Sequence, residues 1–149
     1  MIRFLKILPL FICGILYSQE EVVQSVYFDF DKFNLDEKQG NAVVNFIKNT
    51  DSTRIESVQI FGYTDDVGKE AYNFKLSTNR ANTIREKLIH SGIKNKIIVT
   101  IEGKGRILIE DDVVENLPEK RSKNRRVDVV LNLKPLPKIE IPGFFNTIQ

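Results

Sequence analysis

The residues with the clearest chemical potential in this sequence are an aspartate and an arginine placed 15 positions apart, Asp65 and Arg80. Asp65 lies in a polar turn, directly after an alternating, β-branched segment that predicts a strand ending near Tyr63. Arg80 lies on the flank of the apolar stripe of the helix that follows, so we expect it to be half-buried at the edge of a groove. Because the end of a strand and the first turns of the next helix are neighbours, the two charged groups are expected to face a common shallow site.

Two interpretations of this pair are open. Asp65 and Arg80 could form a structural ion pair with each other. They could instead form a receptor for a zwitterion, in which the guanidinium makes two parallel hydrogen bonds to a ligand carboxylate and the aspartate binds a ligand ammonium. Their spacing alone does not distinguish the two interpretations.

Other residues offer little catalytic or metal chemistry. His90 is the only histidine, and it lies near the end of a predicted helix, where a basic ring is favoured by the helix dipole. No serine or cysteine has an evident base, and the usual zinc ligand sets and EF-hand spacings are lacking from the sequence. We therefore expect no enzyme, no metal and no cofactor. A hydrolase would need an acid and base pair, for which the sequence shows no apolar pocket.

The two ends of the sequence differ from its centre. Residues 1–18 combine a short basic start with an apolar run, which is typical of a secretory signal peptide. Cys13 lies in that run, and we expect it to be removed with the signal peptide rather than lipidated. Residues 19–24 are predicted to be flexible, and residues 134–149 to form a tail that contains prolines.

Residues 25–133 are expected to form one domain. The predicted elements are strands at 22–30, 58–63, 96–102 and 126–131, helices at 36–49 and from about 69 to a stop at Gly92, and a surface loop at 106–124. Asn34 is expected to cap the first helix, and glycines 103 and 105 to end the third strand. This βαβαβ-β order predicts an α/β (α+β) sandwich, with a mixed four-stranded sheet and the helices on one face.

Several spaced motifs resemble those of the OmpA-like peptidoglycan-binding domain, a family that includes the peptidoglycan-associated lipoprotein and the periplasmic part of the flagellar stator protein B. The resemblance covers nearly all of the predicted mature chain. Tyr63 stands where the family commonly has histidine, and this departure leaves Asp65 and Arg80 unchanged. The motifs are Gly62-Tyr63-Thr64-Asp65 with Gly68, Tyr72-Asn73, Leu76-Ser77, Arg80-Ala81 and Asn124-Arg125-Arg126-Val127.

The resemblance implies a function without catalysis: binding of the diaminopimelate in the stem peptide of the cell wall, through Asp65 and Arg80. It also implies secondary ligand bonds from Asp31 and Asn73, with Leu76 as an apolar wall. Weaker candidates are Thr64 and Phe30, with roles in orientation and in the core. Of Arg125 and Arg126, one is expected to brace the loop near the pocket and the other to be exposed, and the sequence leaves open which is which.

The expected location is the periplasm of a Gram-negative bacterium, with association with the outer membrane as an option and no transmembrane segment in the mature chain. The net charge of +2 gives no reason to expect nucleic acid as a partner. Peptidoglycan is the expected partner. The alternative is a module of the same fold that binds other envelope proteins through the acidic loop and the tail.

Overall fold

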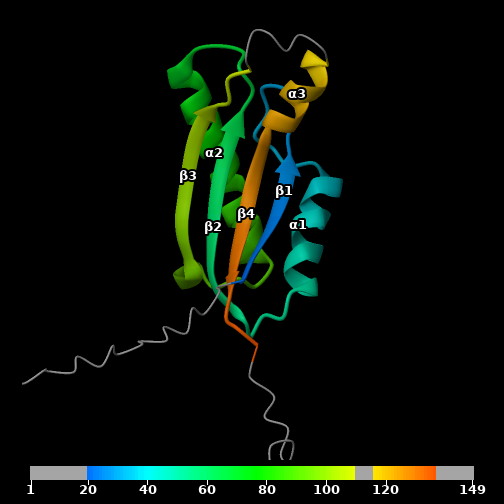
Figure 1. Ribbon diagram of the computed structural model, residues 1–149, viewed down its shortest axis with the longest axis vertical. Coiled ribbons are helices and arrows are strands. Elements are labelled where there is room, and N and C mark those ends of the chain that lie inside the picture. Colours follow the sequence, from blue (N-terminus) through cyan, green and yellow to red (C-terminus); the bar gives the residue numbers. More distant parts are fainter. Residues whose placement is uncertain (1–19, 110–115, 137–149) are drawn as a thin grey trace, which may run out of the picture.

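Four strands form one mixed sheet in the computed structural model, which describes residues 20–109 and 116–136. The sheet order is β1-β4-β2-β3, with β4 antiparallel to both neighbours and β2 parallel to β3. Helices α1 and α2 lie on one face of the sheet, and α3 lies at one end of it (Figure 1). The predicted sandwich with a mixed four-stranded sheet is confirmed. The elements are β1 (Glu20–Tyr27), α1 (Glu37–Asn49), β2 (Ile55–Thr64), α2 (Glu70–His90), the 3-10 turn η1 (Asn95–Ile97), β3 (Ile98–Arg106), α3 (Leu117–Asn124) and β4 (Arg126–Leu133).

The core lies between the sheet and the helices. Alternation along each strand places one set of β-branched and leucine side chains on the helical face, where they are fully buried. Helix α2 contributes Ile84 and Leu88 to this core, and α1 contributes Val43. The strand residues in this set include Val26, Val58, Ile60, Val127, Val129 and Leu131, of which the last three were predicted to face the core.

The first strand differs from its prediction at both ends. Residues 20–24, predicted to be flexible, pair with β4, so the sheet begins before the expected domain boundary. The strand then ends at Tyr27, and Phe30, which was expected on its inner face, is 59% exposed. The chain turns away because Asp31 adopts a left-handed conformation, with φ 57°.

Three further boundaries were predicted wrongly. The cap of α1 is Asp36, whose carboxylate accepts a hydrogen bond from Gln39 N, and not Asn34. The third strand runs through Gly103 and Gly105 to Arg106 instead of ending before them. Part of the predicted loop at 106–124 is helix α3, which begins beside a proline at its first turn.

Glycine in β2 and β3 allows α2 to pack unusually close to the sheet. A Cβ atom added to Gly62 would lie 2.1 Å from Ser77 O, and one added to Gly103 would lie 2.5 Å from Thr78 N. Since backbone atoms of a helix cannot move aside locally, any side chain at these positions would push α2 off the sheet. The approach of α2 matters for function because this helix carries Asn73, Leu76 and Arg80.

Replacing Gly62 with alanine is therefore expected to lower the free energy of unfolding by about 3 kcal/mol. The matched control is Gly40→Ala in α1, where the nearest atoms to an added Cβ are 3.5 Å away. This control should raise the free energy of unfolding by about 0.5 to 1 kcal/mol, because alanine is the better helix former. Urea unfolding followed by circular dichroism measures both, and equal stability of the two variants would contradict the close contact.

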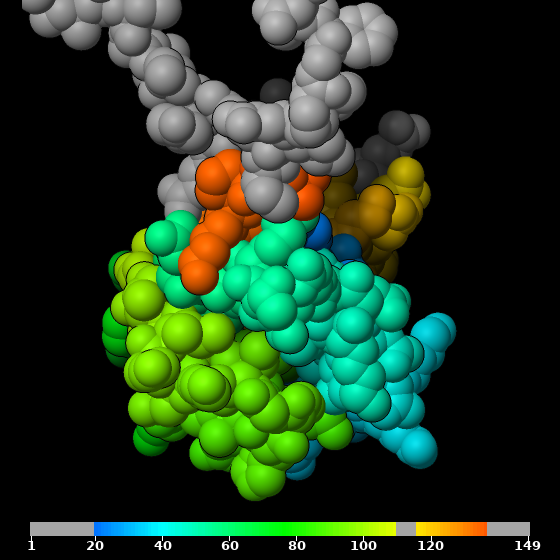
Figure 2. Space-filling model, turned by 90° about the horizontal axis from the view of Figure 1, so that it is seen from below, coloured from blue at the N-terminus to red at the C-terminus, as the bar shows by residue number. Residues whose placement is uncertain are grey.

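Both ends of the described chain lie at the end of the sheet opposite α3. Glu20 pairs with Leu133 in the β1–β4 ladder. Residues after β4 lie against the connection between α1 and β2, where Lys134 N donates to Arg54 O at 2.8 Å (Figure 2). The predicted signal peptide and Cys13 lie outside the described residues, as does the predicted tail from residue 137. No helix within the described ranges is long and apolar enough to cross a membrane.

Candidate functional site

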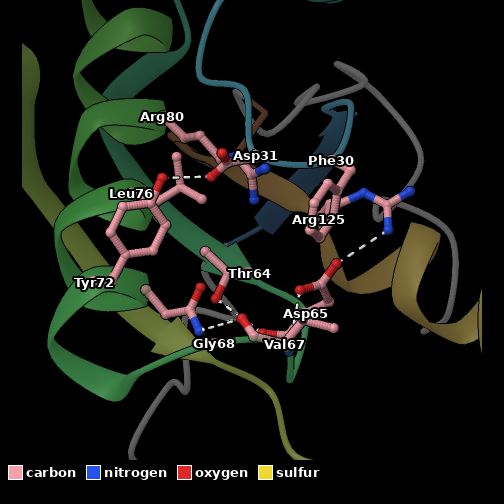
Figure 3. A pocket seen from close by; sticks show the side chains of 11 residues that line it. Phe30, Asp31, Thr64, Asp65, Val67, Gly68, Tyr72, Leu76, Arg80 and Arg125 are labelled. Carbon is pink, nitrogen blue, oxygen red and sulfur yellow. Dashed lines mark hydrogen bonds and ion pairs between the residues drawn. The ribbon is translucent and has the colours of Figure 1, made fainter.

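A pocket of about 180 Å³ opens at the end of β2, where the chain turns into α2 (Figure 3). The first turns of α2 form one wall, and the connection after β1 and the start of β4 approach from the other side. The pocket brings together all six predicted ligand-binding residues as well as Phe30 and Arg125, whereas Arg126 does not line it. Its lining consists of Phe30, Asp31, Thr64, Asp65, Val67, Gly68, Tyr72, Asn73, Leu76, Arg80 and Arg125.

Arg80 is fully buried, with 0% of its surface exposed, which corrects the prediction of a half-buried residue. Its guanidinium donates to three backbone carbonyls: Nε to Lys32 O at 2.8 Å, Nη1 to Tyr63 O at 2.9 Å and Nη2 to Asp29 O at 3.0 Å. The guanidinium carbon also lies 5.2 Å from the centre of the Phe28 ring. Arg80 thereby ties the connection after β1 to the end of β2.

Burial lowers the pKa of Arg80 to about 10, and the nearby charge of Asp65 opposes that shift. The side chain therefore stays protonated at neutral pH. Arginine carries five N–H donors, and the three carbonyls occupy three of them. One N–H on each terminal nitrogen, Nη1 and Nη2, thus has no hydrogen-bond partner among the described residues, and Arg80 lines the pocket.

Asp65 pairs with Arg125 and not with Arg80. Arg125 Nη1 donates to Asp65 Oδ2 at 3.1 Å, and Val67 N donates to Oδ1 at 3.2 Å. Asp65 is only 4% exposed, and it lines the same pocket as Arg80. The structural ion pair between Asp65 and Arg80 is therefore not formed, and each group is held by its own partners on the pocket wall.

The other predicted residues shape the pocket through bonds within the protein. Asn73 Nδ2 donates to Val67 O at 2.8 Å, and Thr64 Oγ1 donates to Asp65 O at 3.1 Å, so both hold the acidic loop. Asp31 accepts a hydrogen bond from the Tyr72 hydroxyl, which raises the pKa of Tyr72. Leu76 is buried and forms an apolar wall of the pocket.

Arg125 directly precedes β4 and Arg126 is its first residue, and the two side chains lie in different surroundings. Arg125 lines the pocket and also donates through Nε to Phe28 O at 3.2 Å, so it is the residue that braces the site. Arg126 lies over the Tyr63 ring at 4.7 Å and donates to Asp128 on the same strand. Arg126 is half-buried, which corrects the expectation that one of the two arginines would be exposed.

Sequence reasoning missed a second ion pair that holds the acidic loop, in addition to the pair between Asp65 and Arg125. Arg121 of α3 donates to both carboxylate oxygens of Asp66, at 2.7 and 3.0 Å, and this lowers the pKa of Asp66. The lining residues Val67, Gly68 and Tyr72 were also not predicted as site residues, although Gly68 and Tyr72 belong to the motifs. No pattern in the sequence pointed to Arg121, because the segment around it was interpreted as a loop.

Within residues 20–109 and 116–136, no three histidine, cysteine or acidic side chains are grouped to hold a metal.

Comparison with known proteins assigns the family. Residues 27–125 match the OmpA family over about two thirds of the chain. This chain belongs to the OmpA family. The OmpA-family relatives include outer membrane protein A of Bordetella avium, 35% identical over 104 residues that cover 69% of this chain and 52% of that protein. The peptidoglycan-binding protein ArfA of Mycobacterium tuberculosis is 40% identical over 76 residues, which cover 50% of this chain and 22% of that protein.

Solved structures agree with this assignment. The OmpA-like domain of FopA1 from Francisella tularensis superimposes with a TM-score of 0.57 and 28% identity, covering 78% of this chain and 77% of that one. The peptidoglycan-associated lipoprotein from Burkholderia pseudomallei gives a TM-score of 0.55 and 26% identity, over 74% of this chain and 89% of that one. This OmpA-family chain spans about half the length of the Bordetella protein and less of the mycobacterial one.

Proposed function

We propose that this OmpA-family domain binds peptidoglycan without covalent chemistry, through the amino acid head of the diaminopimelate in the stem peptide. The observation that carries the proposal is the pocket in which a guanidinium with two remaining donors and a carboxylate face the same space without bonding to each other. An amino acid head carries one carboxylate and one ammonium, so it complements both groups at once.

In the proposed complex, the head carboxylate accepts hydrogen bonds from Nη1 and Nη2 of Arg80, and the head ammonium lies against Asp65. Both protein groups are already desolvated and held in place, which reduces the entropy lost on binding. Leu76 packs against the methylene chain of diaminopimelate, and Asp31 and Asn73 lie close enough to the head to accept or donate further bonds. Phe30 and Tyr72 extend the pocket outward as exposed aromatic side chains.

The names of related proteins support this assignment. The mycobacterial relative is a peptidoglycan-binding protein, and the Burkholderia structure is that of a peptidoglycan-associated lipoprotein. Relatives from the outer membrane support a place in the bacterial envelope, on its periplasmic side, for this chain. A pocket built of fixed charges supports a role in anchoring or organising the envelope rather than catalysis.

The test compares two stem tripeptides that differ only in their third residue, meso-diaminopimelate or L-lysine. Lysine keeps the ammonium but lacks the carboxylate that Arg80 would bind, a charge-assisted contact of about 2 kcal/mol. We expect the lysine peptide to bind about 30-fold more weakly in isothermal titration. Equal affinity for both peptides, or no binding of the diaminopimelate peptide, would refute the proposed ligand.

A further inference from the structure

A second hollow lies beside the pocket, between the first turns of α2 and the end of β3. It has a volume of about 850 Å³, larger than the pocket itself, and we call it the side groove. Its lining consists of Glu70, Ala71, Phe74, Lys104, Gly105, Arg106 and Leu108. None of these residues was predicted as a site residue from the sequence.

The side groove and the pocket are adjacent. Thr64, which lines the pocket, pairs with Arg106, which lines the side groove, across the β2–β3 ladder. Neighbouring strands are about 4.8 Å apart, which is close to the length of one extended residue. At the start of α2, Gly68 lines the pocket and Glu70, two residues later, lines the side groove. The pocket and the side groove are therefore lined by neighbouring residues of the same strand pair and of the same end of α2.

The side groove offers a cation with unused donors. The side chain of Arg106 is 34% exposed, and its acidic neighbours are Glu70, at 3.9 Å, and the more distant Asp66. That distance is too long for a hydrogen bond, and Glu70 is itself widely exposed to solvent. Lys104 also lines the groove, but its ammonium lies over the Phe61 ring and pairs with Glu102 at 2.7 Å. Among the residues that line the groove, Arg106 is thus the cation whose guanidinium has no hydrogen-bonded carboxylate.

The remaining walls are apolar. Phe74 is 57% exposed and Leu108 is 69% exposed, although both are large hydrophobic side chains. Exposed apolar surface that surrounds a charged group is typical of a ligand groove. Gly105 forms part of the floor, and its amide donates to Ser77 Oγ at 2.9 Å, so this part of β3 is held firmly against α2. A small apolar residue that ends in a carboxylate would fit both features.

We infer that the side groove binds the alanine that follows diaminopimelate in a stem peptide, and that Arg106 binds the free carboxylate at its end. The inference rests on the proposed function, because it places diaminopimelate in the neighbouring pocket. The alanine methyl group contacts Phe74 and Leu108, and the guanidinium of Arg106 makes the charge-assisted bonds. The domain then prefers stem peptides that end in a free carboxylate.

The experiment uses one tetrapeptide, L-Ala-γ-D-Glu-meso-diaminopimelate-D-Ala, with its last carboxyl group either free or converted to the amide. The diaminopimelate head is identical in both peptides. We expect the full chain to bind the free acid about tenfold more tightly than the amide. Arg106→Gln should bind both forms equally, with the affinity of the unmodified chain for the amide. Arg85→Gln is the control, since Arg85 donates to Asn95 at the far end of α2 and its loss alters only the net charge.

Two results would overturn the inference while leaving the proposed function intact. One is equal affinity of the unmodified chain for the acid and the amide, and the other is a preference for the acid that persists in Arg106→Gln. If neither tetrapeptide binds, the inference and the proposed function are both wrong. Phe74→Ala provides a second check, because its side chain is exposed and its removal should not impair folding. It should weaken the binding of both tetrapeptides to a similar extent.

Discussion

Replacement of Arg80 with alanine is expected to lower the free energy of unfolding by about 3 to 5 kcal/mol. The change leaves the carbonyls of Asp29, Lys32 and Tyr63 without their donors, in a region where the arginine is fully buried. It also removes the packing of the guanidinium against Phe28. Urea unfolding followed by circular dichroism measures the loss. Arg85→Ala, a half-buried arginine of the same helix with a surface partner, should cost less than about 1 kcal/mol.

Arg80→Lys separates the structural role from the binding role. An ammonium keeps the positive charge and can donate to some of the three carbonyls, so the loss of stability should be smaller than in Arg80→Ala. It cannot offer two parallel donors to a carboxylate, and we expect binding to purified peptidoglycan sacculi to fall at least about tenfold. If Arg80→Lys folds well and binds sacculi like the unmodified chain, Arg80 has no part in ligand recognition.

Asp65→Asn is expected to weaken the binding of a diaminopimelate peptide by about 2 to 5 kcal/mol, or about 30-fold to several thousandfold. Asparagine has nearly the same shape and can still accept the hydrogen bond from Val67 N. It lacks the negative charge that would bind the ligand ammonium. Isothermal titration with the stem peptide measures the change, and the melting temperature shows whether the unpaired Arg125 also affects folding.

The neighbouring carboxylate provides a closely matched control for this experiment. Asp66→Asn makes the same change of charge one residue away, but Asp66 bonds to Arg121 of α3 and does not line the pocket. Because asparagine can still accept a hydrogen bond from Arg121, much of the support of the loop is kept, and we expect the affinity for the stem peptide to stay within about threefold of the unmodified chain. Equal losses in the two variants would mean that the net charge of the loop, and not the position of Asp65, governs binding.

Both acidic side chains connect the pocket loop to the segment around α3. Asp65 pairs with Arg125 at the end of that segment, and Asp66 pairs with Arg121 within it. A loop that is held from two points presents its ligand groups in one arrangement, which favours binding because less conformational freedom is lost. Helix α3 is therefore a structural support of the proposed peptidoglycan site.

The sequence alone determined the fold class and named most of the residues that the structure gathers in one pocket, whereas their role in binding stays a prediction. The change from alternation with a period of two to helical spacing after Tyr63 is a local signal, and it located the acidic loop between β2 and α2. The resemblance of the motifs then pointed to Asp65, Arg80 and their neighbours, which the structure brings into one pocket. The fold class and the placement of these residues could be predicted because each depends on residues that are close together in the chain or on a recognisable motif.

Only the tertiary structure decided how those residues are paired. Strand β4 lies between β1 and β2, and Val127 is in register with both Val26 and Gly62. That register places Arg125 beside Asp65, although 60 residues separate them in the chain. The same packing buries Arg80 under the connection after β1, which sequence periodicity could not foresee. Which side chains pair with each other follows from strand order and register. These are properties of the assembled sheet rather than of any one segment.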